Sequence, residues 1–222
     1  MNKIALVTGA NKGIGYTTVK MLAEQGMTVL LGSRDEQRGQ QAAQQLAQQG
    51  LDVHYLHLDM EDSSSFTSAY SYIADTYGKL DILINNAGVQ IESDTWQTNT
   101  TESIPMEILR KTFDINFFGM VELTQKLLPL IRKSEAGRIV NLTSILGSLE
   151  FHATPGSNTY NTKTFAYNTS KTAVNSFTIH LAHLLKDTNI RVNAAHPGWV
   201  QTDMGGKGAH LTPEQGASTS IM

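Results

Sequence analysis

The sequence predicts an α/β protein built on a doubly wound parallel sheet with flanking helices. Short apolar runs alternate with longer stretches of helical period, which is typical of βαβ units. Each run is near-continuously apolar, as expected for a strand that is buried on both faces. The length fits one domain, which we expect to span residues 1–222. The predicted strands are residues 4–7, 29–31, 53–56, 82–84, 139–142 and 192–195.

The stretches between these strands contain the predicted helices. One helix begins near Gly13. A Gln-rich stretch over 35–49, followed by Gly50 as a stop signal, indicates a surface helix; a polar low-complexity tract is the other interpretation. Residues 105–133 open with a proline, which a first helical turn accepts, and residues 165–186 carry apolar side chains at core spacing. No internal repeat or linker divides the chain.

Composition excludes several classes of protein and site. The formal net charge of −3 argues against a nucleic-acid partner, which usually meets a basic excess. The absence of Cys excludes disulfides, thiolate zinc sites and Cys nucleophiles, and we expect no metal site. No apolar run approaches the ~20 residues of a membrane span, and the first residues lack the features of a signal peptide. We therefore expect a cytoplasmic protein with neither a membrane nor a nucleic-acid partner.

A glycine-rich turn follows the first predicted strand. Residues 8–15 read Thr-Gly-Ala-Asn-Lys-Gly-Ile-Gly, so the glycines are spaced G-x-x-x-G-x-G. Glycines permit a tight turn and a close approach of backbone to a pyrophosphate, while the next helix offers free N–H groups to an anion. An ordinary turn between strand and helix is the alternative. The position after the first strand favours a dinucleotide site.

Tyr167 and Lys171 stand four residues apart within a predicted helix. This spacing places them on one helix face, one turn apart. A lysine cation near a phenol favours the phenolate and lowers the pKa of the tyrosine from ~10 toward neutrality, which suits general acid–base catalysis. Taken alone, this spacing is weak evidence for a catalytic site, because many helices contain a Tyr and a Lys four residues apart by chance.

Polar clusters at two further strand ends strengthen this interpretation. Asn85-Asn86-Ala87-Gly88 follows the fourth strand and Thr143-Ser144 follows the fifth. Ligands of open α/β sheets bind beyond the carboxyl ends of the strands. Each cluster alone could be a set of turn residues. Together with the glycine turn and the Tyr/Lys pair, they predict one crevice.

These motifs resemble the short-chain dehydrogenase/reductase family. The match covers residues 1 to about 204 in the family's order. The resemblance implies a Rossmann-type fold, a nicotinamide cofactor and catalysis by the four residues Asn116, Ser144, Tyr167 and Lys171. The matching residues are Thr8–Gly15, Asp59, Asn85–Gly88, Asn116, Ser144, Tyr167, Lys171 and Pro197-Gly198.

The resemblance also implies roles for these residues. Ser144 would donate to the carbonyl oxygen as negative charge develops there, and Tyr167 would deliver the proton. Lys171 would lower the pKa of Tyr167 and bind the nicotinamide ribose, while Asn116 would hold a water that passes protons to Lys171. The cofactor contacts expected are Gly9, Asn11, Lys12, Gly13, Ile14, Gly15, Ser33, Arg34, Asp59, Met60, Asn86, Ala87, Gly88, Tyr167, Lys171, Pro197, Gly198, Val200 and Thr202.

The end of the second strand favours NADP(H) over NAD(H). Ser33 stands where an NAD site tends to place its acid, and Arg34 follows it with a guanidinium suited to phosphate. Lys12 adds a second cation, so the two form a small cationic site. Asp35 and Glu36 are expected to cap the next helix. The alternatives are a solvated loop charge for Arg34 and, at Asp59, a turn residue instead of an adenine contact.

Two segments near the predicted crevice depart from compact family members. Ser144 and Tyr167 lie 23 positions apart (144 to 167), and the excess, roughly residues 151–165, is polar. It forms either a wall of the substrate pocket or a mobile surface loop. Residues 90–104 are also polar and contain Trp96, which is a pocket wall or an anchor for the loop. At the other end of the chain, residues 211–217 look like the start of a late helix. The final edge strand of the family is expected to be missing, either because the sequence is cut short or because the protein lacks that strand.

The function predicted from the sequence is NADPH-dependent reduction of aldehydes or ketones, or the reverse reaction. A 3-oxoacyl-thioester reductase is one alternative, and a catalytically silent NADP-binding regulator is another. The expected partner is a small carbonyl substrate, and the protein is expected to be a monomer or a homodimer. Pocket walls predicted at Gln90, Ile145, Leu146 and Trp199 suggest a medium-sized apolar carbonyl.

Overall fold

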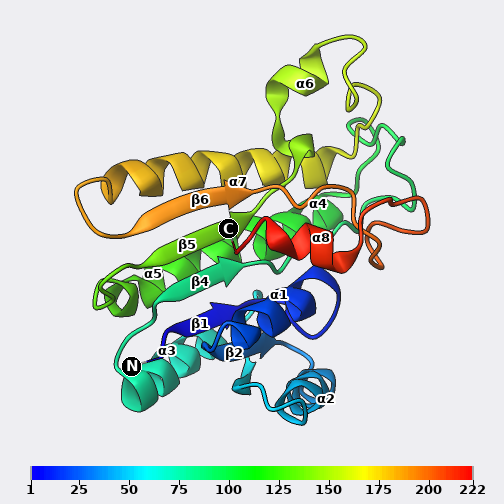
Figure 1. Cartoon of the computed structure of the whole chain (residues 1–222). Helices are drawn as coiled ribbons and strands as arrows, with labels where there is room; N and C mark the ends of the chain where they lie inside the picture. Colours follow the sequence, from blue (N-terminus) through cyan, green and yellow to red (C-terminus); the bar gives the residue numbers. More distant parts are fainter. Residues whose placement is uncertain (1, 222) are drawn as a thin grey trace.

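A computed structural model describes residues 2–221 and contains one parallel sheet of six strands (Figure 1). The strand order is β3-β2-β1-β4-β5-β6. All neighbouring strands pair in parallel, which confirms the predicted sheet. The order reverses between β1 and β4, which is where ligands bind in sheets of this type. The strands are β1 (Ile4–Val7), β2 (Thr28–Ser33), β3 (Val53–His57), β4 (Ile82–Asn85), β5 (Arg138–Leu142) and β6 (Arg191–Ala195).

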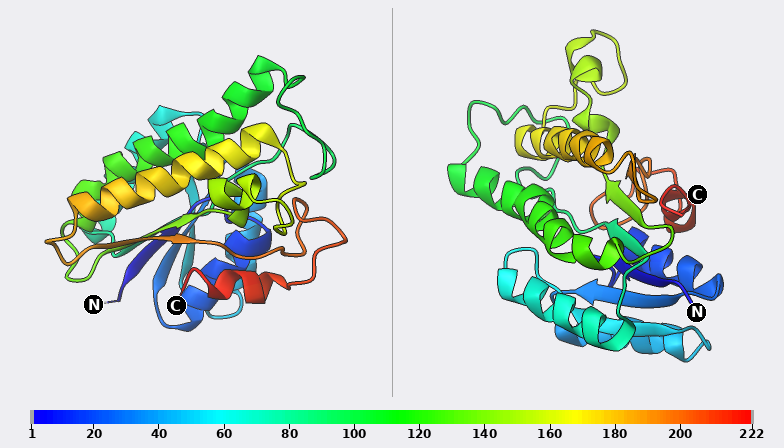
Figure 2. Two further views of the ribbon diagram at one scale, coloured as in Figure 1. Left: turned by 90° about the horizontal axis from the view of Figure 1, so that it is seen from above. Right: turned by 90° about the vertical axis from the view of Figure 1, so that its left-hand side faces the viewer.

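Helices cover both faces of the sheet (Figure 2). One face carries α1 (Gly13–Glu24), α2 (Glu36–Ala47) and α8 (Pro213–Ser218). The other face carries α3 (Ser63–Tyr77), α4 (Met106–Phe113), a π-helix η1 (Asp114–Phe118), α5 (Gly119–Ile131) and α7 (Phe165–Leu184). A 3₁₀ turn η2 (Ile145–Gly147) leads into α6 (Leu149–Ala153), which projects from the body of the molecule at the top of Figure 1.

Alternate side chains of the central strands fill two separate cores. In β1, Ile4 and Leu6 belong to the cluster under α3, α5 and α7, while Ala5 and Val7 belong to the cluster under α1 and α2. This alternation is the period of two that a strand imposes. The expectation that every strand is buried on both faces is wrong for the outermost strands. β3 and β6 each expose two residues or more because only one neighbour and fewer helices cover them.

The predicted helices are found with two differences. The stretch predicted as one helix over 105–133 is interrupted by η1, where the hydrogen-bonding pattern widens to a π-helix around Asn116. The helix α3 was not identified from the sequence, although Asp62 caps its start and Gly78 ends it with a positive φ of 74°. The Gln-rich stretch forms α2, with Asp35 as its N-cap, and α8 lies within the predicted late helix.

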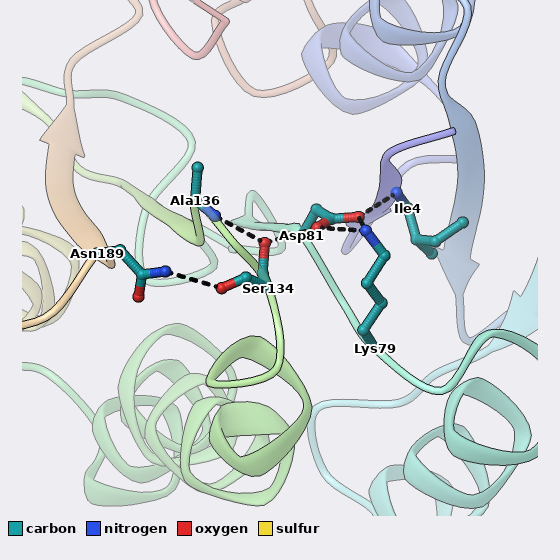
Figure 3. Close-up of polar contacts among 6 residues, drawn as sticks. All are labelled: Ile4, Lys79, Asp81, Ser134, Ala136 and Asn189. Carbon is teal, nitrogen blue, oxygen red and sulfur yellow. Dashed lines mark hydrogen bonds and ion pairs between the residues drawn. The ribbon is translucent and has the colours of Figure 1, made fainter. Parts of the chain in front are cut away.

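A buried carboxylate joins the amino ends of the central strands (Figure 3). Asp81 accepts hydrogen bonds from the Ile4 N–H at 2.9 Å and from the Ser134 hydroxyl at 2.5 Å, and its partner Lys79 lies 2.9 Å away. Asn189, in the connection before β6, donates to the Ser134 carbonyl at 3.1 Å. The network fixes the edge of the sheet that lies opposite the predicted crevice.

Candidate active site

The glycine turn after β1 forms a cradle that accepts no side chains. A Cβ added at Gly9 would lie 2.8 Å from the Cα of Ala87, and one at Gly15 would lie 2.5 Å from Asn86 Nδ2. Gly9 and Gly13 also have positive φ angles of 62° and 57°. The turn is therefore shaped by close backbone approach, as a phosphate-binding turn requires.

The segment after β4 is tied to this turn by hydrogen bonds between side chains and the main chain. Asn86 donates from its side chain to the carbonyls of Thr8 at 2.8 Å and Gly9 at 3.1 Å. The Thr8 hydroxyl accepts from the N–H groups of Asn86 and Ala87. Asn86 and Ala87, both predicted cofactor contacts, thus join the segment after β4 to the glycine turn.

The N-terminus of α1 suits an anionic group. Lys12 at the N-cap makes no capping bond through its side chain, and the first turn contains no acidic residue. The first N–H groups of the helix keep their hydrogen-bonding capacity, and the helix dipole favours negative charge there. These residues fit the pyrophosphate of a dinucleotide. Asn11 lies in the same turn, and Ile14 packs its side chain against the core under α1.

Tyr167 and Lys171 project from α7 into the buried end of the site. Lys171 Nζ lies 5.7 Å from the centroid of the Tyr167 ring and donates to the carbonyl of Leu142 at 2.9 Å. A Cβ added at Gly88 would lie 3.5 Å from Lys171 Nζ, so Gly88 leaves this cation room. The predicted pair therefore shares one face of α7, beside the segment that follows β4.

The pKa values of the pair differ from the expectation. Burial raises the pKa of Tyr167 to about 12, against a smaller lowering by its hydrogen bond with Ser144. Burial also lowers the pKa of Lys171 to about 8. The predicted lowering of the Tyr167 pKa toward neutrality is therefore wrong for the protein alone, because desolvation of the buried phenol outweighs the contacts that favour the phenolate. In this environment the phenol is protonated at neutral pH.

Ser144 is placed against α7 by a tightly packed turn. Its hydroxyl accepts from the Leu146 N–H at 3.1 Å and so caps η2. A Cβ at Gly147 would lie 2.8 Å from the carbonyl carbon of Lys171, and Thr172 donates to the Gly147 carbonyl. This contact brings the end of β5 onto the helix turn that carries Tyr167 and Lys171.

The side chain of Asn116 joins the segment after β4 to α7 by hydrogen bonds. Its Oδ1 accepts from the Val89 N–H at 2.7 Å, and its Nδ2 donates to the Val89 carbonyl at 2.9 Å and to the Ser170 hydroxyl at 3.0 Å. The side chain is buried in η1. These three bonds occupy the amide, and they join the segment after β4 to α7 next to Lys171. The water-holding role implied by the resemblance stays a prediction.

The cations predicted for a 2′-phosphate are both paired with acids. Lys12 Nζ lies 2.5 Å from Asp203 Oδ2, and Arg34 lies 3.5 Å from Glu61 Oε2. Both cations remain more than half exposed. Ser33 is buried and donates to the Asp35 carbonyl. The predicted cationic site is thus present but partly neutralised by acids from other segments.

The remaining predicted cofactor contacts lie in the segments that follow β3 and β6. Asp59 accepts from the Glu61 N–H at 3.1 Å, so it does act as a turn residue. Met60 is buried against Gly119. Thr202 lies against Gly13: a Cβ added at Gly13 would be 3.3 Å from the methyl group of Thr202. The Thr202 hydroxyl accepts a hydrogen bond from the Gly205 N–H. Pro197, Gly198 and the buried Val200 follow β6 and lead into this segment.

The loop over 90–104, which the sequence predicted to lie near the site, contacts the start of α7. Trp96 packs edge-on against Tyr167 with ring centroids 5.2 Å apart, which is a contact of the loop over 90–104 with a predicted catalytic residue. Glu92 of the same loop accepts hydrogen bonds from the N–H groups of Ala166 and Tyr167. Sequence reasoning missed Glu92 and Asp203, because their partners lie 74 and 191 positions away and no local spacing signals them.

Within residues 2–221 no helix combines the length and the apolar character needed to span a bilayer. Over the same residues no three His, Asp or Glu side chains gather in a way that could hold a metal ion.

Comparison with known proteins assigns the family. Residues 3–210 match the model of the short chain dehydrogenase family. Carbonyl reductase [NADPH] 1 of Bos taurus is 35% identical over 99% of this chain and 90% of its own length. The (+)-neomenthol dehydrogenase of Arabidopsis thaliana is 31% identical over 99% of this chain and 90% of its own. Salutaridine reductase from Papaver somniferum superposes with a TM-score of 0.84 at 28% identity, over 99% of this chain and 94% of that one. With its Rossmann-like sheet and this similarity along almost its whole length, the chain belongs to the short-chain dehydrogenase/reductase family of nicotinamide-dependent oxidoreductases.

Proposed function

We propose that the protein reduces aldehyde or ketone carbonyls to alcohols with NADPH, and that Tyr167 is the proton donor. The observation that carries this proposal is the buried phenol of Tyr167, which has Ser144 beside it and Lys171 Nζ 5.7 Å from its ring centroid, next to the glycine cradle. A bound nicotinamide would supply a hydride to the carbonyl carbon. The protein must then supply a proton and stabilise the oxygen on which negative charge develops.

The protonation states of the site suit the reductive direction. Because burial raises the pKa of Tyr167 to about 12, the phenol holds its proton at neutral pH and can donate it to the substrate oxygen. Ser144 supplies a second hydrogen bond to that oxygen. Lys171, whose Nζ points at the same region, stabilises the phenolate left after proton transfer. Asn116 holds the segment after β4 against α7.

The preference for NADPH over NADH rests on two cations at the rim. Lys12 and Arg34 are exposed enough to exchange their present acid partners for a 2′-phosphate. The segment at the end of β2 presents the hydroxyl of Ser33 where an NAD site would present a carboxylate. Relatives named carbonyl reductase [NADPH] 1, at 33% to 35% identity, support the same choice.

The substrate class proposed is a medium-sized apolar carbonyl. Apolar side chains stand exposed on the two segments that follow β5 and β6, namely Leu149 and Phe151 of α6 and Trp199 and Met204 beyond β6. Exposed apolar side chains on segments that continue from the ends of these strands offer a surface for an apolar ligand. Names of relatives such as (+)-neomenthol dehydrogenase and salutaridine reductase agree with such substrates.

A panel of aldehydes, cyclic ketones, quinones and acetoacetyl-CoA, with NADPH absorbance as the readout, tests this proposal. We expect turnover of apolar ketones or aldehydes and its loss in Tyr167→Phe, with NADPH binding retained. Removal of a general acid costs about 10² to 10⁴ in rate. Turnover of acetoacetyl-CoA alone would favour a thioester reductase. Tight NADPH binding with no turnover on any member of the panel would favour a silent regulator and overturn the proposal.

A further inference from the structure

The N-terminus of the helix that carries Tyr167 is capped from a distant loop. The local N-cap residue, Thr164, makes no capping bond, because its hydroxyl donates to Asn168 Oδ1, and the first turn of α7 has no acidic residue. Four N–H groups at the start of any helix lack partners within the helix. The first three of α7 belong to Phe165, Ala166 and Tyr167, and they need partners from elsewhere.

Glu92 and Thr100 supply those partners. Glu92 Oε2 accepts from the Ala166 N–H and Oε1 accepts from the Tyr167 N–H, each at 2.8 Å. The Thr100 hydroxyl accepts from the Phe165 N–H at 3.0 Å and donates to Glu92 Oε2 at 2.7 Å. Both carboxylate oxygens are thus engaged, and every one of these three N–H groups is satisfied.

The same loop also touches the ring of Tyr167. Trp96 stands four residues after Glu92 and packs its ring against that of Tyr167 at 5.2 Å between centroids, with 78° between the planes. Thr100 donates its own N–H to the carbonyl of Lys163, two residues before the start of α7. The loop over 90–104 therefore holds Tyr167 by its main chain through Glu92 and by its side chain through Trp96.

We propose that Glu92 is a positioning residue for proton transfer, and that it sets the place of the Tyr167 phenol by clamping the main-chain N–H of Tyr167 itself. This inference rests on the proposed role of Tyr167 as proton donor. Two charge-assisted hydrogen bonds from one carboxylate fix both distance and direction. Misplacement of a reacting group by about 1 Å costs on the order of 100-fold in rate, so a loosened helix start lowers kcat.

Glu92→Gln tests the clamp with little change in shape. The amide keeps one acceptor oxygen, but its NH₂ group faces an N–H that it cannot accept from. We expect kcat to fall by about tenfold or more, while the KM for NADPH stays unchanged because the glycine cradle is intact. The ratio of kcat in H₂O to kcat in D₂O is expected to rise as proton transfer becomes slower. A merely smaller folded fraction would lower kcat and leave that ratio unchanged.

The matched control is Asp94→Asn, an exposed carboxylate two residues along the same loop. It is expected to leave kcat, the isotope ratio and NADPH binding unchanged. Amide hydrogen exchange of the peptide over 164–170 gives a readout that needs no substrate. It is expected to accelerate in Glu92→Gln by about tenfold and not in Asp94→Asn.

Each outcome decides a different point. Faster amide exchange with unchanged kcat and isotope ratio would make Glu92 a structural cap only and overturn the inference, as would unchanged exchange. If Glu92→Gln does not fold, Thr100→Val removes the hydroxyl bonded to Phe165 and Glu92 and is expected to act in the same direction. Turnover retained in Tyr167→Phe would instead overturn the proton-donor assignment, and amide exchange would still report whether Glu92 holds the helix start.

Discussion

Lys12 and Asp203, 191 positions apart, form an ion pair across the mouth of the glycine cradle. The pair holds the segment after β6 over the N-terminus of α1, and the contact of Thr202 with Gly13 lies directly beside it. Lys12 is also a cation that a 2′-phosphate would need. In the proposed complex with NADPH, Asp203 and the 2′-phosphate would therefore compete for the same ammonium group.

Asp203→Asn is expected to tighten NADPH binding. The change frees Lys12 for the phosphate, and exposed ion pairs are weak, so the expected gain is about two- to fivefold in Kd. NADH binding should not change, because it has no 2′-phosphate. Titration of both cofactors by fluorescence at low and high salt measures this. An equal change for NADPH and NADH would show that Asp203 acts on loop closure and not on the cation.

Arg34→Asp is expected to weaken NADPH binding far more than NADH binding. A guanidinium bonded to a phosphate contributes about 1.5 to 3 kcal/mol, so the expected loss is on the order of ten- to a hundredfold in Kd. Glu61→Gln is the matched variant, because it removes the present partner of Arg34 and should strengthen NADPH binding slightly. An NADPH KM unchanged in Arg34→Asp would contradict the assignment of Arg34 to the phosphate.

The strands were predictable because each is a short apolar run, and this signal is local in the sequence. The helix α3 was also predictable in principle, since Phe66, Ala69 and Ile73 repeat at helical spacing between Asp62 and Gly78. The π-helix around Asn116 was not, because its geometry accompanies bonds to Val89 and Ser170, which lie 27 and 54 positions away. The partial exposure of β3 and β6 was not predictable either, because it depends on their position at the edges of the sheet. The apolar runs in the sequence do not specify the strand order.

For the candidate site, the order of residue types in the sequence predicted which segments belong to it, but not its electrostatics. The glycine turn follows β1 and Ser144 follows β5, while Tyr167 and Lys171 lie on α7, from which Lys171 reaches the carbonyl of Leu142 at the end of β5. The direction of the Tyr167 pKa shift was mistaken, because a four-residue spacing says nothing of the desolvation that tertiary burial imposes. The acid partners of Lys12 and Arg34 likewise come from segments with which they share no sequence pattern.

The rate of carbonyl reduction is expected to fall as pH rises through about 8. Burial lowers the pKa of Lys171 to about 8, so the cation that stabilises the developing phenolate is lost above that pH. The phenol of Tyr167 itself stays protonated to far higher pH, since its pKa is raised to about 12. A kcat–pH profile measures this, with the exposed Lys126→Met as control. A flat profile up to pH 10 would contradict the role of Lys171.

Gly15→Ala is expected to weaken NADPH binding by about tenfold or more. The added Cβ would lie 2.5 Å from Asn86 Nδ2 and 2.7 Å from the Gly9 carbonyl, so Asn86 must leave the turn that it holds. Gly26→Ala is the contrast, because its positive φ of 81° is strained but nothing stands within 4 Å of the added Cβ. It should cost stability of roughly 1 to 2 kcal/mol and leave cofactor binding unchanged. Equal cofactor affinity in both variants would argue against the cradle.

The free energy of unfolding is expected to depend on Asp81 at acid pH. Burial alone would raise the pKa of Asp81, but hydrogen bonds from Ser134, Ile4 and Lys79 outweigh it and hold the pKa below its usual value (Figure 3). Because the folded pKa lies below the unfolded one, the stabilisation is complete above about pH 4 and is lost as pH falls through the folded pKa.

Asp81→Asn should therefore lower the free energy of unfolding at pH 7 by about 2 to 4 kcal/mol, since it removes the charge from a buried network and leaves Lys79 without its partner. It should also flatten the loss of stability below pH 4 relative to the unmodified protein. Urea unfolding at pH 3, 4 and 7 measures both effects, and the exposed Asp75→Asn serves as control. If Asp81→Asn and Asp75→Asn changed the unfolding midpoint equally, the network would not be what holds the amino ends of β1 and β4 together.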